Sequence, residues 1–275
     1  MKVFFEVKLG LDAGGEDKDI LIARLSDLGF DGFLEEEDHL LAYCEKDERT
    51  ANSMKSVLAS QGISLIDIRE IADENWNASW ESAYEPVTIS KDLIVRAPFH
   101  EAGKDFEYDI IIEPRMSFGT AHHETTAMML EIILHLEMAG RAVLDMGSGT
   151  GVLAILAFKK GAGEIVAIDN DEWAFQNALD NIQLNDANTI KVELGDAGTI
   201  SSRLFDIIIA NINRNILLKD IPEYTRALNK NGTLILSGFY DEDLEVITDK
   251  CSSCGLSFIS KNMTNRWTAA VFTKN

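Results

Sequence analysis

The sequence predicts an α/β protein, in which a mostly parallel sheet with helices on both faces follows a small α+β unit. From Arg141 onward, short hydrophobic runs alternate with stretches of helical periodicity, which favours parallel strands joined by helices. Three alternating glycines follow the first of these runs, at a place where such sheets bind ligands. At 275 residues the chain is long enough for one large domain or two ordinary ones.

The composition is that of a globular protein, with 46% hydrophobic and 26% charged residues. No apolar run reaches the roughly 18 residues that a membrane helix needs, so we expect no membrane span. The N-terminus soon turns acidic and does not read as a secretory signal. Three cysteines leave at least one thiol unpaired, which indicates a reducing compartment, and we expect the cytoplasm.

The net charge of −21 disfavours direct nucleic-acid binding, because phosphate contacts usually require a basic surface. An acidic surface suits a basic protein partner through long-range attraction, although it can also serve solubility alone. The acidity is marked in residues 1–73, which hold 17 Asp and Glu against 8 Lys and Arg. We therefore expect a basic partner to dock there.

Residues 1–72 have the order β-α-β-β-α-β of a ferredoxin-like sandwich. The strand "VFFEVKL" precedes an apolar-periodic helix over 17–30, and "FLEEEDHLLAYCE" reads as two strands around an acidic turn. A second helix over 50–62 and the strand "ISLIDIREI" complete the unit.

Residues 73–85 predict a polar linker helix, with Trp76 and Trp80 one turn apart as packing anchors. The rest of the chain, residues 86–275, is expected to form one larger domain. It begins with "VTISKDLIVRAPF" and "FEYDIIIEP", which we expect to pair as a β-hairpin, and an apolar helix then ends the stretch 86–140.

The core sheet occupies residues 141–275. Its seven predicted strands are 142–146, 164–169, 190–196, 205–211, 232–239, 256–263 and 267–273. Helices are expected over 151–161, 172–185, 215–228 and 241–252. Only "TNR" separates the last two strands, so they should form an antiparallel hairpin.

Asp145, Gly147, Gly149 and Gly151 follow the first strand of the sheet, where glycine lets a ligand approach the backbone. A site for nucleotide triphosphates would need Gly-Lys-Ser/Thr, and no lysine follows these glycines. A dinucleotide site would need a third glycine where Val152 stands. The observed spacing G-x-G-x-G is typical of a loop that receives S-adenosylmethionine.

Three polar residues end later strands of the sheet. Asp169 can accept hydrogen bonds from both hydroxyls of a ribose, which supports an adenosine ligand in general. Asp196 can accept from the adenine amino group, or it can cap the following turn. Asn211 should face the transferable methyl, where its amide can orient an amine, although asparagine at a strand end is also a common turn former.

The segment "EPRMSFGTAHHETTAMM" lies between the small unit and the sheet. Thr125 and Thr126 can cap the following helix and present hydroxyls to a ligand. His122 and His123 suggest a metal, but no cysteine or further histidine stands at ligand spacing, so we expect none. The "CSSC" at 251–254 has redox spacing, yet its place late in the chain favours ordinary, partly buried thiols.

Taken together, these motifs resemble those of the bacterial methyltransferases that act on large-subunit ribosomal protein eleven. The resemblance covers nearly the whole chain: the small domain, the Trp-containing linker, "FGTAHHETT", "LDMGSGTGVLAI", the acid in "AIDND", and "IANI". It implies a Rossmann-like class I methyltransferase fold with S-adenosyl-L-methionine as cofactor. The family usually has Gly-Thr-Gly where this chain has Ala121 in the second glycine's place, which affects the expected shape of that loop.

The resemblance also implies roles for individual residues. It places cofactor contacts at Thr126, Gly147, Asp169 and Asn211. It matches the family's lining segment to Phe118, Gly119, Thr120 and His123. The small domain would recognise the ribosomal protein, and the products would be methylated lysine side chains and N-terminal amines. We expect a monomer.

Methyl transfer requires a neutral amine, and a carboxylate beside the amine would favour its charged form. We therefore expect no acidic residue next to Asn211 and Phe118. The sequence alone leaves rivals: a methyltransferase acting on another basic protein, RNA or a small amine, a nicotinamide-dependent oxidoreductase, and a non-catalytic cofactor binder. Val152 disfavours the oxidoreductase, and the lack of a basic or aromatic stripe in residues 1–72 disfavours RNA.

Overall fold

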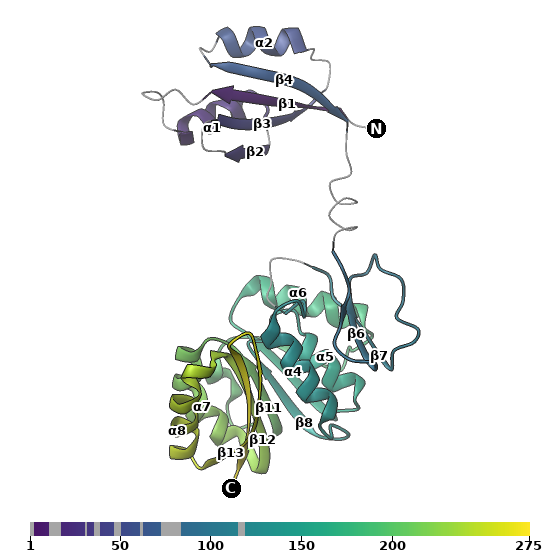
Figure 1. Cartoon of the computed structure of the whole chain (residues 1–275), viewed down its shortest axis with the longest axis vertical. Helices are drawn as coiled ribbons and strands as arrows, with labels where there is room; N and C mark the ends of the chain where they lie inside the picture. Colours follow the sequence, from purple (N-terminus) through teal and green to yellow (C-terminus); the bar gives the residue numbers. More distant parts are fainter. Residues whose placement is uncertain are drawn as a thin grey trace. The chain divides into compact units, whose positions relative to one another are not determined.

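The chain forms two compact units, Met1–Tyr84 and Glu85–Asn275. Figure 1 shows the computed structural model, which describes residues 3–10, 18–30, 32–35, 39–46, 51–60, 63–72, 84–114 and 119–275. The expected linker helix, with Trp76 and Trp80, lies almost wholly outside the described residues. Among the helices of the described ranges, none is long and apolar enough to cross a membrane.

The first unit is a four-stranded antiparallel sheet with the order β2-β3-β1-β4. Its elements are β1 (Val3–Gly10), α1 (Lys18–Asp27), β2 (Gly32–Glu35), β3 (His39–Glu45), α2 (Ala51–Ser60) and β4 (Leu65–Ala72). Side chains from the helices and from alternate strand positions form one core that includes Phe5, Leu25 and Leu58. The ferredoxin-like prediction is confirmed.

The second unit begins with a three-stranded sheet of β5 (Val87–Thr88), β6 (Leu93–Arg96) and β7 (Tyr108–Ile111). The predicted hairpin between "VTISKDLIVRAPF" and "FEYDIIIEP" is wrong, because β6 and β7 run parallel and only β5 and β6 are antiparallel. An ion pair between Arg96 Nε and Asp109 Oδ1 (2.7 Å) holds the parallel pair. Asp109 Oδ2 also accepts from the Gly103 backbone N–H in the connecting loop (3.1 Å).

The main sheet has seven strands in the order β10-β9-β8-β11-β12-β14-β13. Its strands are β8 (Ala142–Met146), β9 (Glu164–Asp169), β10 (Lys191–Leu194), β11 (Phe205–Asn211), β12 (Leu228–Tyr240), β13 (Leu256–Thr264) and β14 (Trp267–Lys274). The strands up to β12 are parallel, whereas β14 is antiparallel to both β12 and β13. This arrangement confirms the predicted sheet and its final hairpin.

Helices cover both faces of this sheet (Figure 1). One apolar core lies beneath α4 (Glu124–His135), α5 (Val152–Lys159) and α6 (Glu172–Leu184), and a second lies beneath α7 (Arg214–Ala227) and α8 (Leu244–Ser253). Short 3-10 turns, η1 (Ala197–Ile200) and η2 (Asp241–Asp243), precede β11 and α8. Cys251 is buried in the second core, and burial raises the pKa of its thiol to about 12, as expected of an ordinary structural cysteine.

Asn181 of α6 and Asn185, the C-cap of that helix, hold the β7 segment against the helices of the main sheet. The Asn185 side chain accepts from the Ile111 N–H (2.9 Å) and donates to the Ile111 carbonyl (2.6 Å). Asn181 accepts from the Glu113 N–H (2.8 Å) and donates to the Thr150 carbonyl (2.9 Å). These bonds satisfy backbone groups on the open side of β7, where no further strand of the described residues pairs with it.

Candidate active site

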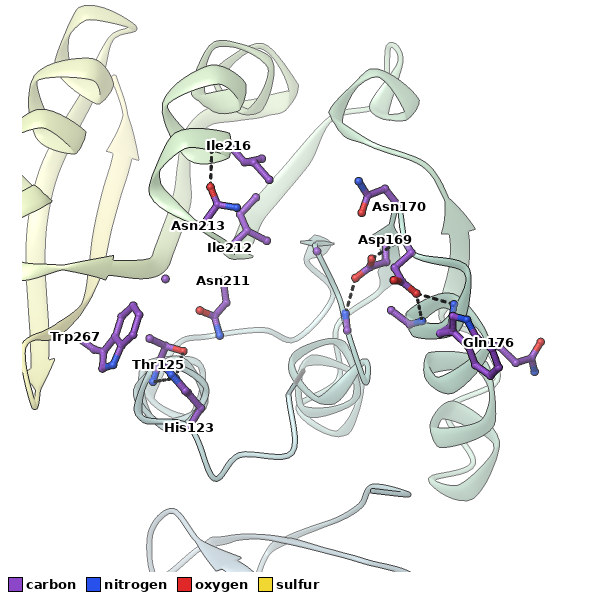
Figure 2. A pocket seen from close by; sticks show the side chains of 16 residues that line it. His123, Thr125, Asp169, Asn170, Gln176, Asn211, Ile212, Asn213, Ile216 and Trp267 are labelled. Carbon is purple, nitrogen blue, oxygen red and sulfur yellow. Dashed lines mark hydrogen bonds between the residues drawn. The ribbon is translucent and has the colours of Figure 1, made fainter. Parts of the chain in front are cut away.

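A pocket of about 940 Å³ opens at the carboxyl ends of β8, β9 and β11 (Figure 2). This is the edge of the sheet at which the order of the strands reverses, where ligands bind in open α/β sheets. The residues that line it are His123, Thr125, Gly147, Gly149, Asp169, Asn170, Asp171, Trp173, Ala174, Gln176, Asn211, Ile212, Asn213, Ile216, Gly238 and Trp267. Its volume lies at the upper end of the range for small-molecule sites.

The glycine at position 147 is required by a neighbouring side chain. A Cβ there would lie 2.2 Å from Ile212 Cγ2, and the residue has a φ of +69°. Gly238, on the other strand that flanks Ile212, would place a Cβ 2.3 Å from the Ile212 carbonyl oxygen. The two glycines therefore let Ile212 pass between the glycine loop and β12, and Ile212 forms part of the pocket floor.

Asp169 joins the two loops that flank the pocket. Its Oδ2 accepts from the Gly149 N–H (2.8 Å) and its Oδ1 accepts from the Asp171 N–H (3.0 Å). A carboxylate has about four acceptor positions, so roughly two remain for a ligand. Asp169 is only 9% exposed, but its side chain still lines the pocket. An acid that binds ribose hydroxyls must reach the pocket in this way.

Asp145, in contrast, lies beneath the loop and does not line the pocket. It is fully buried, and its Oδ2 accepts from the Ala154 N–H (3.1 Å) in α5, whereas its Oδ1 has no partner within the described part of the chain. Burial raises the pKa of this carboxyl to about 7, the charge of Asp169 adds to the rise, and the Ala154 N–H opposes it. Asp145 thus supports the glycine loop from below.

Asn211, at the end of β11, lines the pocket beside α4. Its Nδ2 donates to Thr126 Oγ1 (3.3 Å), while its Oδ1 is buried and has no partner among the described residues. Thr126 is 1% exposed and is not among the residues that line the pocket, and its hydroxyl holds the Asn211 amide in place. A buried acceptor without a partner is costly unless a ligand satisfies it.

His123 and Trp267 form the wall beside Asn211 (Figure 2). The prediction that a threonine caps α4 is wrong, because His123 is the N-cap and its Nδ1 accepts from the Thr125 N–H (3.3 Å). The two rings meet edge to face with centroids 4.9 Å apart, and Tyr240 packs on the other side of Trp267 at 4.3 Å. This packing fixes the orientation of both rings at the pocket.

Gly119, Thr120, Gly151 and Asp196 are predicted site residues that are not in the pocket lining. Gly151 is the N-cap of α5 in the left-handed conformation, and Gly119 accepts from Thr150 Oγ1 through its carbonyl (2.6 Å). Asp196 is exposed and caps η1 by accepting from the Gly198 N–H (2.9 Å), which favours the capping alternative. Thr120 adjoins Gly119 on the same loop, and Phe118 lies outside the described residues.

Ala121 adopts a φ of +68° and is 1% exposed. The position therefore has the left-handed backbone for which the usual glycine is suited, and the loop keeps that shape with alanine in its place. The alanine methyl packs into the core shared by α4 and α5.

Sequence reasoning did not find Trp173, Ile216, Gly238 or Trp267. Trp173 and Ile216 stand close after Asp169 and Asn211, so their places at the start of helices that follow the site strands could have indicated them. Gly238 reaches the pocket because β12 pairs with β11, where Ser237 lies opposite Asn211. Trp267 reaches it because β14 pairs with β12, where Trp267 lies opposite Tyr240.

These features fit S-adenosyl-L-methionine. Asp169 keeps acceptor positions for ribose hydroxyls, and the volume accommodates a cofactor of that size together with an acceptor side chain. Within the described ranges, no cluster of three or more His, Cys, Asp or Glu could hold a metal ion. The strand order, the glycine loop and the acid that ends β9 define a class I S-adenosylmethionine-dependent methyltransferase.

Comparison with known proteins narrows this class. A family model described as ribosomal protein L11 methyltransferase (PrmA) matches residues 22–275. Proteins named ribosomal protein L11 methyltransferase from Porphyromonas gingivalis and Chlorobaculum tepidum are 42% and 37% identical. The first match covers 93% of this chain and 90% of the relative, and the second covers 88% of each.

A crystal structure described as ribosomal protein L11 methylase from Lactobacillus delbrueckii subsp. bulgaricus is 28% identical, with a TM-score of 0.64. The match covers 70% of this chain and all of that one (100%). The chain belongs to the ribosomal protein L11 methyltransferase family. Its enzymes use S-adenosyl-L-methionine, so the nicotinamide-dependent and non-catalytic alternatives are excluded.

The raised pKa of Asp145 predicts a pH-dependent stability. Between the ordinary value of 3.8 and about 7, the folded state binds more protons than the unfolded state, so this carboxyl stabilises the fold at low pH and less as pH rises. Asp145→Asn removes that contribution. The free energy of unfolding of the wild type, relative to that of the variant, should fall from pH 4 to pH 8 in chemical denaturation.

The control is Asp206→Asn. The Ala142 N–H lowers the pKa of Asp206, so its contribution has the opposite sign and is lost as pH falls. Parallel pH profiles for the wild type and Asp145→Asn would contradict this account of Asp145.

Proposed function

We propose that this enzyme transfers methyl groups from S-adenosyl-L-methionine to amines of ribosomal protein L11, at lysine side chains, the N-terminal amine or both. The family assignment supports this function, because relatives that match about nine-tenths of the chain carry that name. The structural observation that carries the proposal is the buried Asn211 Oδ1, which has no partner among the described residues and lies in an uncharged corner of the pocket.

The chemical difficulty lies with the acceptor. The bound cofactor supplies a methyl group activated on a sulfonium, and the attacking amine must present its lone pair. A lysine with an ordinary pKa of about 10.4 is protonated at pH 7, and the neutral form costs about 4–5 kcal/mol. The protein's task is therefore to bind the neutral amine and to orient it.

The corner beside Asn211 meets the first requirement. Figure 2 shows His123, Thr125, Asn211 and Trp267 gathered on one side, whereas Asp169 lies across the pocket. Among the described residues, no carboxylate lines this side of the pocket, and Glu124, whose Oε2 lies 3.9 Å from His123 Nδ1, is outside the lining. A lining without a negative charge disfavours the ammonium form, which lowers the pKa of an entering amine. Asn211 Oδ1 meets the second requirement, because it can accept one amine N–H and so direct the nitrogen lone pair towards the methyl.

His123 does not serve as a general base in this proposal. Its Nδ1 is already engaged at the start of α4 by the Thr125 N–H (3.3 Å) and by Thr125 Oγ1 (2.8 Å), so this nitrogen is directed away from an entering amine. The amine accordingly loses its proton to water before transfer. Bound S-adenosyl-L-methionine would supply the methyl as its S–C bond breaks with the electron pair left on sulfur, and the methylated amine would take up the positive charge.

The acidic first unit is the proposed docking site for L11. Residues 1–73 carry 17 acids against 8 bases, which would attract a basic ribosomal protein from a distance. The first unit would thus attract the substrate, and the second unit would carry out the transfer in a pocket whose described lining beside Asn211 has no carboxylate. We further propose that the enzyme acts as a monomer in the cytoplasm and does not bind nucleic acid directly, in line with its net charge of −21.

The proposal predicts the product of a labelling experiment. Ribosomes from cells that lack this enzyme are incubated with it and with S-adenosylmethionine that carries a radiolabelled methyl, and peptide masses locate the label. Label should appear on L11 nitrogen, at lysine or the N-terminus. Label in RNA, in another basic protein or in a small amine would keep the fold assignment and refute the proposed acceptor.

Asn211→Ala should lower kcat by about 10²-fold, because an amine without its orienting acceptor is seldom aligned for attack. Cofactor affinity, measured by calorimetry, should change little. Asn211→Asp is the matched variant: it keeps an acceptor oxygen but adds a charge that favours the ammonium, so its rate should rise with pH further into the alkaline range. A large loss of cofactor affinity in Asn211→Ala, with kcat unchanged, would contradict the assigned role.

A further inference from the structure

Trp173 is an exposed aromatic residue at the pocket that the preceding mechanism does not use. It lines the pocket, yet its side chain is 84% exposed. The other pocket tryptophan, Trp267, is held between the rings of His123 and Tyr240. Trp173 thus offers a large flat surface that remains in contact with water.

The backbone of Trp173 is fixed although its ring is exposed. Trp173 is the second residue of α6, and its N–H donates to Oδ1 of the N-cap Asp171 (2.7 Å). The same oxygen accepts from the Ala174 N–H (3.1 Å). The Cα therefore has a set position at the pocket wall, and only the side-chain torsions decide where the indole lies.

The other groups at the pocket determine which part of the cofactor comes near this ring. With the sulfonium towards Asn211 and the ribose hydroxyls on Asp169, the adenine must extend past Asp169. Past Asp169, the pocket is lined by the β9–α6 loop and the start of α6, which contribute Asn170, Trp173 and Gln176.

An apolar wall faces this end from α7. Ile212 and Ile216 line the pocket, and Ile216 is 40% exposed on the first turn of that helix. Figure 2 shows both isoleucines on the α7 side, across the pocket from Asn170 and Gln176 on the α6 side. An adenine ring has two apolar faces, so it can pack against aliphatic side chains with one face and an indole with the other.

We propose that Trp173 is an adenosine-binding residue, whose indole stacks on the adenine of the bound cofactor and covers it from water. The proposal rests on the cofactor orientation in the proposed function but not on L11 as the acceptor. Stacking on an indole is favourable for any purine, and in this site the ring needs only rotate about its side-chain bonds to reach the ligand.

The test is calorimetric binding of two ligands without any acceptor: S-adenosylhomocysteine, and methylthioadenosine, which lacks the amino-acid part. Trp173→Ala should weaken both by about tenfold, a change of about 1.4 kcal/mol, because both contain the adenosine. Trp173→Phe keeps an aromatic face and should lose threefold or less. Trp173→Leu keeps apolar cover without aromatic stacking and should fall between them.

Leu179→Ala is the matched control, since Leu179 is also on α6, is 37% exposed and does not line the pocket. It should leave both affinities unchanged. Thermal unfolding of the ligand-free variants should match the wild type, because an exposed side chain contributes little to the fold. Ligand should also protect wild-type tryptophan fluorescence from acrylamide more than it protects that of Trp173→Phe.

Unchanged affinity for both ligands in Trp173→Ala would overturn the proposal, and so would a loss for S-adenosylhomocysteine alone. The second result would place the indole at the amino-acid end. These outcomes are separate from the acceptor question: if wild-type enzyme methylates L11 but Trp173→Ala binds normally, only the role of Trp173 fails. If L11 is not methylated and Trp173→Ala binds tenfold more weakly, only the acceptor assignment fails.

Discussion

The site depends first on the carboxylate of Asp169, which accepts one backbone N–H from each of two loops. Gly149 follows β8 and Asp171 precedes α6, so this single side chain sets the spacing between the glycine loop and the next helix. Two charge-assisted hydrogen bonds also stabilise an anion that is only 9% exposed. The same residue retains acceptor positions towards the pocket, so the interaction that shapes the site also prepares it for a ribose.

At the other end of the pocket the constraint is steric. Ile212 follows Asn211 directly and passes between Gly147 and Gly238, neither of which has room for a Cβ beside it. This passage holds the backbone at the end of β11. Thr126 then orients the Asn211 amide, whose oxygen has no partner among the residues that the structure describes. The amino-acid sequence thus fixes the positions of the acid and the amide at two strand ends separated by one strand, β8.

Much of this could be predicted because local patterns encode it. Buried parallel strands such as β9 and β11 read as continuous apolar runs, and the polar residues that end them mark the ligand edge. The parallel pairing of β6 and β7 could not be read in this way, since it depends on the Arg96–Asp109 ion pair and on Asn185 from a distant helix. The wall formed by Trp267 was equally hidden, because only the hairpin register of β14 carries it to the pocket.

The most direct test of the account is a crystal structure of the protein with S-adenosylhomocysteine. The account predicts ribose hydroxyls within hydrogen-bond distance of Asp169 and the sulfur beside Asn211. It also predicts an open space next to His123 and Trp267, large enough for an acceptor side chain. A ligand bound with its adenine beside Asn211, or outside this pocket, would contradict it.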